Sequence, residues 1–208
     1  MIDETFENAR WLIGAIARGL KAREAAEGVD EMLGRLAQQQ VGRSSFRAVD
    51  PGGLPVVSYL PDCIGETVLL DSDLAASLAA IADDLQWHQS EAYSDQLLGD
   101  GFMANYGWCE IIGPRGFFPG DDFLLGLLML GPDCHYKDHY HPAPELYWPL
   151  TGLSDWKRGA GGFETRAAGE IIWHPPLRMH ATRTAARPLL TVWSWTRDTG
   201  TPSKLAGG

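Results

Sequence analysis

The chain has 208 residues, of which 45% are hydrophobic and 21% are charged, and its formal net charge is −10. A chain of this length and composition suits one domain, or one domain with an extension, and can bury a proper hydrophobic core. The negative charge repels phosphate backbones and no cluster of Lys or Arg offsets it, so we expect no nucleic-acid partner.

The first residues, MIDETFENARWLIG, are acidic, and Arg10 and Arg18 interrupt the apolar run that they begin. This pattern is typical of neither a signal peptide nor a membrane span, and no later segment reaches about 18 uncharged apolar residues. Cys63, Cys109 and Cys134 are scattered without CxxC spacing, so we interpret them as reduced, buried thiols. We therefore expect a cytoplasmic protein with no membrane partner.

The first part of the chain has helical patterns. Apolar residues recur every three or four positions through residues 3–40, and Gly28 breaks this run before a second helix at Val29–Gln40. Another helix is expected to start at Asp71 and to continue through LAASLAAIADDLQW. Turn-rich connectors are expected at residues 51–57 and 60–63.

From about residue 101 the pattern changes to short apolar segments separated by Gly and Pro. The expected strands are WCEIIG, DFLLGLLML, ELYWPL, EIIWHP and LLTVWSW. Short strands at this spacing indicate a β-sandwich or barrel. We expect residues 1–100 to form a helical N-terminal extension that packs on a β-barrel of residues 101–208.

The most informative segment is HYHPAPELY, residues 139–147. Residues two apart on a strand share a face, so His139 and His141 would point to one side, as would Glu145 and Tyr147. Imidazole and carboxylate ligands of this kind suit Fe, Mn, Co, Ni or Zn. The spacing therefore predicts a mononuclear metal site with a phenol close to it.

A second segment, GEIIWHPPLRMH at residues 169–180, has the pattern of a strand, a proline turn and a histidine. Together the two segments resemble the paired motifs of the cupin superfamily. The first motif is matched by His139, His141, Glu145 and Gly152. Its leading glycine departs from the family pattern, since seven residues rather than five separate Gly131 from His139.

The second motif is matched at Gly169, Pro175 and His180, while Leu177 stands in place of a family Gly and Thr184 in place of a family Asn. These departures change a turn but leave all four ligand positions filled. The resemblance implies a mainly β fold, a single cupin (double-stranded β-helix, or jelly-roll) barrel with the helical N-terminal extension. It also implies one divalent transition metal ion, with His139, His141, Glu145 and His180 as its ligands.

Further residues narrow the resemblance to one group of cupins. With Tyr147 two residues after Glu145, an aromatic-rich barrel and a helical extension, the chain resembles the cupin-type dimethylsulfoniopropionate (DMSP) lyases, the DddQ-like branch. Tyr136 matches a second family tyrosine, Trp195 falls at a substrate-facing Trp and Phe123 at a pocket Phe. The resemblance covers roughly residues 100–197. It implies a lyase that splits DMSP into dimethyl sulfide and acrylate.

The residues can be assigned roles in such a reaction. A metal bound to the substrate carboxylate would stabilise enolate-like charge, and a nearby divalent cation would favour the phenolate of Tyr147, the expected base. Tyr136 is expected to be an accessory or alternative base. Trp193 and Trp195 share a strand face, and aromatic faces attract a sulfonium with about 1–2 kcal/mol per desolvated contact. The expected partner is DMSP alone, bound by a monomer or homodimer.

Two alternatives remain open at this point. Another mononuclear-metal cupin enzyme, such as an Fe-dependent dioxygenase, would use the same ligands without needing Tyr147 as a base. A non-catalytic cupin would only bind a small molecule. His174 and His88 belong to no motif and are interpreted as structural, whereas Arg178 and Lys137 either pair with a substrate carboxylate or are solvated at the surface.

Overall fold

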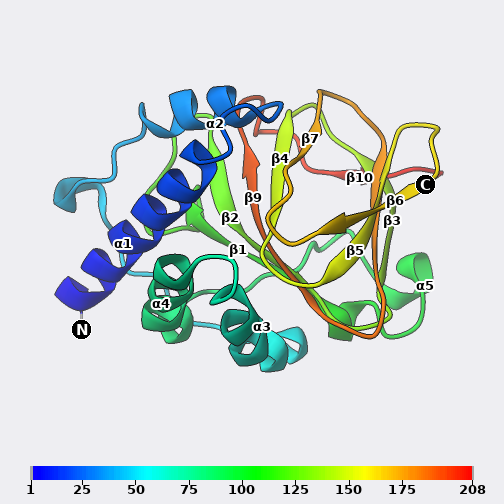
Figure 1. Cartoon of the computed structure of the whole chain (residues 1–208), viewed down its shortest axis with the longest axis horizontal. Coiled ribbons are helices and arrows are strands. Elements are labelled where there is room, and N and C mark those ends of the chain that lie inside the picture. Colours follow the sequence, from blue (N-terminus) through cyan, green and yellow to red (C-terminus); the bar gives the residue numbers. More distant parts are fainter. Residues whose placement is uncertain (1, 208) are drawn as a thin grey trace.

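The computed structural model describes residues 2–207 and contains a helical layer beside two β-sheets (Figure 1). The α-helices are α1 (Ile2–Lys21), α2 (Val29–Leu36), α3 (Leu60–Thr67), α4 (Ser72–Ile81) and α5 (Asp95–Leu98). Asp71 caps α4 by accepting hydrogen bonds from the backbone NH groups of Asp73 and Leu74, as its position before the apolar stripe predicted. None of the described helices is both long and apolar enough to cross a membrane.

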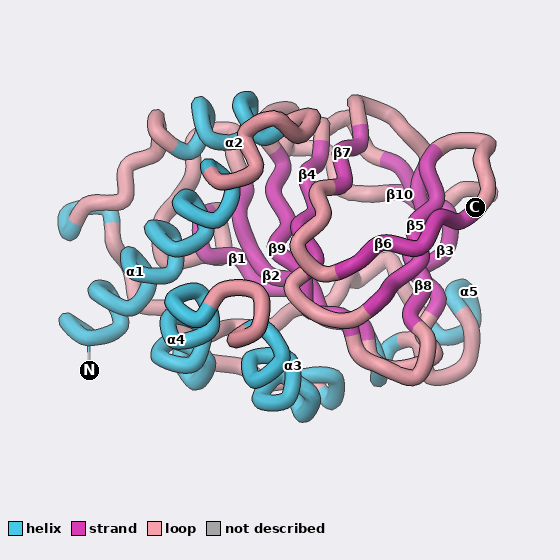
Figure 2. The backbone as a smooth tube through the Cα atoms, viewed as in Figure 1, coloured by secondary structure: helices cyan, strands magenta, loops and turns pink. Residues whose placement is uncertain are grey.

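The strands form two five-stranded antiparallel sheets that close into a barrel (Figure 2). The first sheet has the order β1-β2-β9-β4-β7 and the second the order β10-β3-β8-β5-β6. The strands of the first sheet are β1 (Tyr106–Ile112), β2 (Leu124–Leu130), β9 (Leu189–Trp195), β4 (Glu145–Pro149) and β7 (Ile172–His174). Those of the second are β10 (Lys204–Leu205), β3 (His135–Tyr140), β8 (His180–Thr184), β5 (Leu153–Arg158) and β6 (Phe163–Ala167). This is the cupin barrel that the paired motifs implied.

Both faces of the first sheet are buried, because the helices cover its outer face. On β2, Leu125 and Leu127 pack into a core shared with the helices, whereas Leu124 and Leu128 pack inside the barrel. The same alternation on β4 sends Leu146 toward the helices and Tyr147 into the barrel. Burial on both sides explains why the strands of this sheet have nearly continuous apolar sequences.

Several expectations about local structure were wrong. The helix expected at Val29–Gln40 ends at Leu36, and the helix expected to continue to Trp87 ends at Ile81. The segment 60–63, expected to be a connector, forms the first turn of α3, because Pro61 needs no NH partner in the first turn of a helix. Part of the 51–57 connector belongs to a 3₁₀ helix at Pro55–Tyr59. The expected apolar strands lie in the first sheet. In the second sheet only the segment of His139 was expected on a strand, and LSDWKR and FETRA were missed because they are polar and partly exposed.

The cysteines are free thiols buried in the core, as the sequence predicted. Burial raises the pKa of Cys63, Cys109 and Cys134 to about 12, so each stays a neutral thiol at neutral pH.

Candidate metal centre

The predicted ligands converge inside the barrel from both sheets. Glu145 begins β4 in the first sheet, with its side chain on the inner face. His139 on β3 and His180 on β8 are cross-strand partners in the second sheet, and His141 follows the end of β3. These four side chains are only 1–3% exposed, so the site is enclosed by the barrel.

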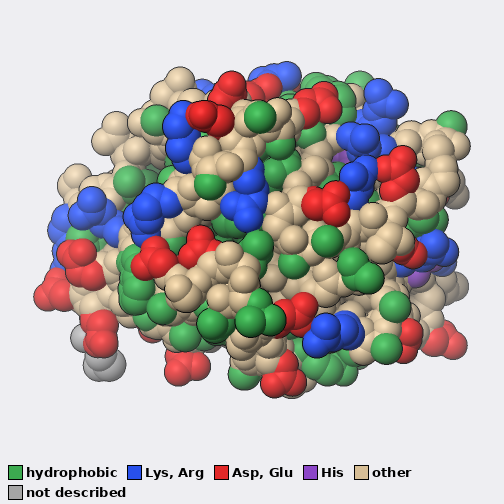
Figure 3. Space-filling model, viewed as in Figure 1, with side chains coloured by type: hydrophobic (Ala, Val, Ile, Leu, Met, Phe, Trp, Pro, Cys, Tyr) green, Lys and Arg blue, Asp and Glu red, His purple; other side chains and the backbone are tan. Residues whose placement is uncertain are grey.

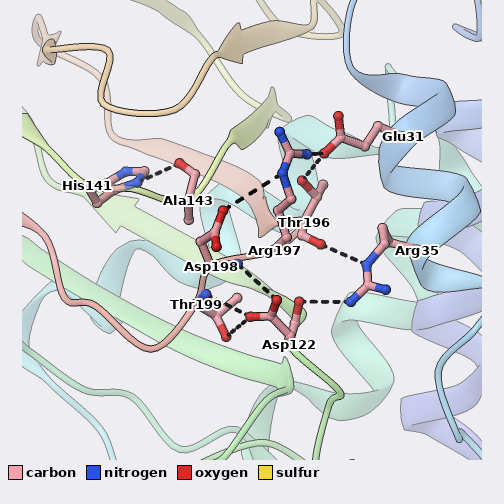
Figure 4. Close-up of polar contacts among 9 residues, drawn as sticks. All are labelled: Glu31, Arg35, Asp122, His141, Ala143, Thr196, Arg197, Asp198 and Thr199. Atoms are coloured by element: carbon pink, nitrogen blue, oxygen red, sulfur yellow. Dashed lines mark hydrogen bonds and ion pairs between the residues drawn. The ribbon is translucent and has the colours of Figure 1, made fainter.

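Backbone carbonyls fix the orientation of the histidine rings. Nδ1 of His141 is 2.9 Å from the carbonyl oxygen of Ala143, a contact visible in Figure 4, and Nδ1 of His180 is 2.7 Å from that of Arg178. Nδ1 of His139 makes the same contact with Lys137 at 2.8 Å. A carbonyl only accepts, so Nδ1 carries a proton in each ring and Nε2 is the nitrogen left for another partner. This is how metal-binding histidines are held.

Glu145 connects two of these histidines. Its Oε2 is 3.1 Å from Nε2 of His141 and 3.1 Å from Nε2 of His180. Ligand atoms of these three residues lie within 4.8 Å of one another, a spacing that would hold one metal ion. Burial by itself would raise the pKa of Glu145, but its charge interactions and hydrogen bonds with His141 and His180 hold the pKa well below the usual range.

His139 lies beside this group. Its ring centroid is 4.1 Å from that of His180 and 6.5 Å from that of His141. Burial and the charge of His180 lower the pKa of His139 well below its usual value, so the ring is neutral, as a ligand must be. Its role as a fourth ligand stays a prediction.

Tyr147 and Tyr136 both face the centre. Tyr147 follows Glu145 on the inner face of β4, and its ring lies 6.4 Å from that of His180. Burial, together with the negative charge of Glu145 and a hydrogen bond to it, raises the pKa of Tyr147 well above 10. Tyr136 stacks on His139 at 3.8 Å, and burial raises the pKa of this phenol too. Neither phenol ionises at neutral pH without a nearby cation.

The predicted aromatic residues divide into two groups. Trp193 and Trp195 lie on β9 opposite Tyr147 and Glu145, and their ring centroids are 6.0 Å apart. The Trp195 ring is 4.3 Å from that of His141. Phe123, by contrast, is buried in the core shared with the helices, and its role in substrate binding stays a prediction.

A network at the C-terminal end of β9 holds the strand that carries Trp195 (Figure 4). Thr196 and Arg197 both contact Glu31 of α2. Arg35 of the same helix donates to the carbonyl oxygens of Thr196 at 2.8 Å and Asp122 at 3.0 Å. The helical layer therefore positions the β9 end of the site.

His174, which the sequence led us to interpret as structural, lies beside the centre. This residue is completely buried on β7, opposite Glu145, and its ring stacks on that of His180 at 4.1 Å with an interplanar angle of 12°.

Comparison with known proteins gives a consistent result. The family model for dimethylsulfoniopropionate lyase matches residues 26–191. Over 165 residues the chain is 28% identical to a dimethylsulfoniopropionate lyase, DddQ of Ruegeria pomeroyi, with 74% of this chain and 81% of that protein covered.

Solved structures show the same fold. A crystal structure from work on the DMSP lyases RdDddP and RnDddQII superposes with a TM-score of 0.76 at 23% identity, over 97% of this chain and 99% of that one. A sugar phosphate isomerase of the cupin superfamily from Silicibacter pomeroyi superposes with a TM-score of 0.50 at 17% identity, over 61% of this chain and 80% of that one.

Proposed function

The chain belongs to the dimethylsulfoniopropionate lyase family, and on this premise we propose that it is a metal-dependent lyase that cleaves DMSP into dimethyl sulfide and acrylate. The observation that carries the metal dependence is the shared environment of Glu145. Two imidazoles whose Nδ1 atoms are held by backbone carbonyls present Nε2 to the same carboxylate oxygen at 3.1 Å. A buried set of two imidazole nitrogens and one carboxylate fits a divalent transition metal ion.

His141, Glu145 and His180 would hold this ion, with His139 as the proposed fourth ligand. When bound, an ion such as Fe, Zn, Mn, Co or Ni would polarise the substrate carboxylate and stabilise negative charge on it. The donor types do not discriminate among these metals, because imidazole and carboxylate suit all of them.

Tyr147 is the proposed base. Its oxygen takes the proton from the carbon next to the carboxylate, the electron pair forms the C=C bond of acrylate, and the C–S bond breaks. Dimethyl sulfide leaves as a neutral molecule, so the reaction needs no general acid. The raised pKa of Tyr147 disfavours the phenolate that the base needs. A cation bound at Glu145 would lower this pKa, because the cation would cancel the carboxylate charge that disfavours phenolate. Tyr136, stacked on His139, is the accessory or alternative base.

Trp193 and Trp195 would receive the sulfonium group. They border the centre from β9. Aromatic faces attract a desolvated cation, and they do so without placing another carboxylate beside the substrate.

A headspace assay tests the proposed function. Metal-loaded protein mixed with DMSP should release dimethyl sulfide and acrylate in equal amounts, and chelation of the metal should stop the release. The rate should be the same with and without oxygen, which separates a lyase from an Fe-dependent dioxygenase. Absence of dimethyl sulfide from protein loaded with each candidate metal would refute the assignment.

A further inference from the structure

A cavity lies on the inner face of β5, the face that carries Trp156 and that Arg158 shares with its cross-strand partner His180. It has a volume of about 310 Å³ and is bordered by β5, β6, the end of β7 and the turn before β8. Its lining residues are Glu27, Trp156, Arg158, Gly161, Gly162, Glu164, Arg166, Ile172, Pro175 and Arg178. Small-molecule sites begin at about this volume, so the cavity has room for a compact ligand.

Two of its arginines have no acidic partner. Arg166 forms ion pairs with Glu164 and Glu170 and is neutralised by them. Arg158 only approaches the Trp173 carbonyl oxygen, at 3.4 Å, and neither it nor Arg178 forms an ion pair within the described residues 2–207. Figure 3 shows basic side chains gathered beside acidic ones over the sheet half of the molecule.

The backbone brings the segments that carry these two arginines together. Nη1 of Arg178 would lie 3.1 Å from a Cβ added to Gly159, the residue directly after Arg158. The NH of Gly159 also donates to the carbonyl oxygen of Met179 at 2.7 Å, which joins the two segments that carry the arginines. Each of these arginines lines the cavity, and the fork of a guanidinium group matches the geometry of a carboxylate.

The rest of the lining limits the ligand. Trp156, Ile172 and Pro175 give the cavity an apolar part, which suits a short hydrocarbon chain better than an inorganic anion. Glu27 also borders the cavity and would repel an ion with two negative charges.

The cavity also adjoins the metal centre. The Trp156 ring is 4.9 Å from that of Tyr147, and Ile172 is the cross-strand partner of Tyr147. Arg158 is the cross-strand partner of His180. Cross-strand partners share a face of the sheet, so Arg158 lies on the same face as His180.

We propose that Arg158 and Arg178 form a binding site for short-chain carboxylates with one negative charge, in the cavity that Trp156 and Ile172 also line. The identification of acrylate or DMSP as the natural ligand rests on the proposed function, but the carboxylate site itself does not.

Propionate is the probe, because it has the chain length of acrylate and no double bond. It is titrated into the zinc-loaded protein at constant ionic strength while the amide NMR signals of Gly161 and Gly162 and the indole NH of Trp156 are followed. These signals should shift and saturate. Arg158→Gln and Arg178→Gln should each raise the Kd measured there about tenfold. Arg187→Gln, outside the cavity beside Glu66, should leave the Kd unchanged.

Several outcomes would overturn the site. These are absence of propionate shifts at Gly161 and Gly162, equal Kd values in wild type and both cavity variants, or phosphate binding there more tightly than propionate. Dimethyl sulfide release is measured on the same samples. Propionate binding without lyase activity would refute the proposed function alone, whereas lyase activity without propionate binding would refute the carboxylate site alone.

Discussion

The indole nitrogen of Trp195 donates a hydrogen bond to Oε1 of Glu145 over 2.8 Å, between residues that face each other on β9 and β4. The other oxygen of the same carboxylate faces His141 and His180. The bond leaves Oε2 directed at the two histidines, so Trp195 orients the Glu145 carboxylate, in addition to the substrate-binding role proposed for its ring.

Trp195→Phe should therefore weaken metal binding by about 10- to 100-fold, the usual effect of losing a hydrogen bond to a metal ligand. Competition with a chelator gives the dissociation constant. Trp11→Phe is the matched control. The Trp11 indole also donates to a carboxylate, that of Asp73, but this pair lies in the helical layer and not in the barrel. Unchanged metal affinity in Trp195→Phe would show that the bond does not orient Glu145.

Removing a ligand should strip the metal. His141→Ala and His180→Ala should each lose most bound metal and most turnover while the barrel stays folded, because both ligand atoms belong to one centre. Metal analysis and circular dichroism of the purified variants check this. His135→Ala, an exposed histidine on β3, should keep the metal. Full metal occupancy in both ligand variants would contradict the proposed centre. The metal content of His139→Ala decides whether the protein supplies three or four ligands.

Tyr147→Phe tests the base. The substitution keeps the ring that packs against Trp156 and removes only the oxygen that accepts the proton. We expect kcat to fall by about 10²-fold or more, with metal content unchanged. Tyr136→Phe should reduce kcat less. Near wild-type kcat in Tyr147→Phe would refute Tyr147 as the base. A larger loss of kcat in Tyr136→Phe would make Tyr136 the base and Tyr147 the accessory residue.

The contact between the helical layer and the barrel depends on a glycine. A Cβ added to Gly19 of α1 would lie 2.1 Å from Cη2 of Trp148, which is completely buried. Gly19→Ala should lower the free energy of unfolding by about 1–3 kcal/mol, as overpacking does. Gly34→Ala on α2 is the control, since no atom lies within 4 Å of the added Cβ. It should raise stability by up to about 1 kcal/mol through helix propensity. Urea denaturation of both variants measures these changes.

The buried tyrosines predict a pH dependence. Burial raises the pKa of Tyr93, Tyr106, Tyr136 and Tyr147 in the metal-free fold. The folded chain therefore holds these protons more tightly than the unfolded chain. The resulting stabilisation is fully present below about pH 10 and is lost as the pH rises through the raised values.

Absorbance at 295 nm measures the ionised tyrosines. Near pH 10 the native metal-free protein should show much less tyrosinate than the same protein in denaturant. The rest of the tyrosinate absorbance should appear when the protein unfolds at higher pH. Equal amplitudes in the native and denatured protein would contradict the burial of these phenols.

The sequence by itself determined the features that depend on near neighbours in the chain. Helical periodicity identified α1, α2 and α4, and alternation of faces on a strand placed Glu145 and Tyr147 together inside the barrel. The spacing of HYHPAPELY and the second histidine segment carried the cupin resemblance. Local spacing is sufficient for these features, because the backbone geometry of a helix or strand fixes which residues share a face.

Tertiary structure alone decided which distant residues meet. The stack of His174 on His180, the bond from Trp195 to Glu145 and the approach of Arg178 to Gly159 each join segments whose adjacency depends on strand order and register. Sequence periodicity also did not reveal strands β5 and β6 of the second sheet, because their exposed faces carry polar residues. These contacts follow from hydrogen bonding between strands and from burial in the completed barrel, and neither is present in any short segment of the chain.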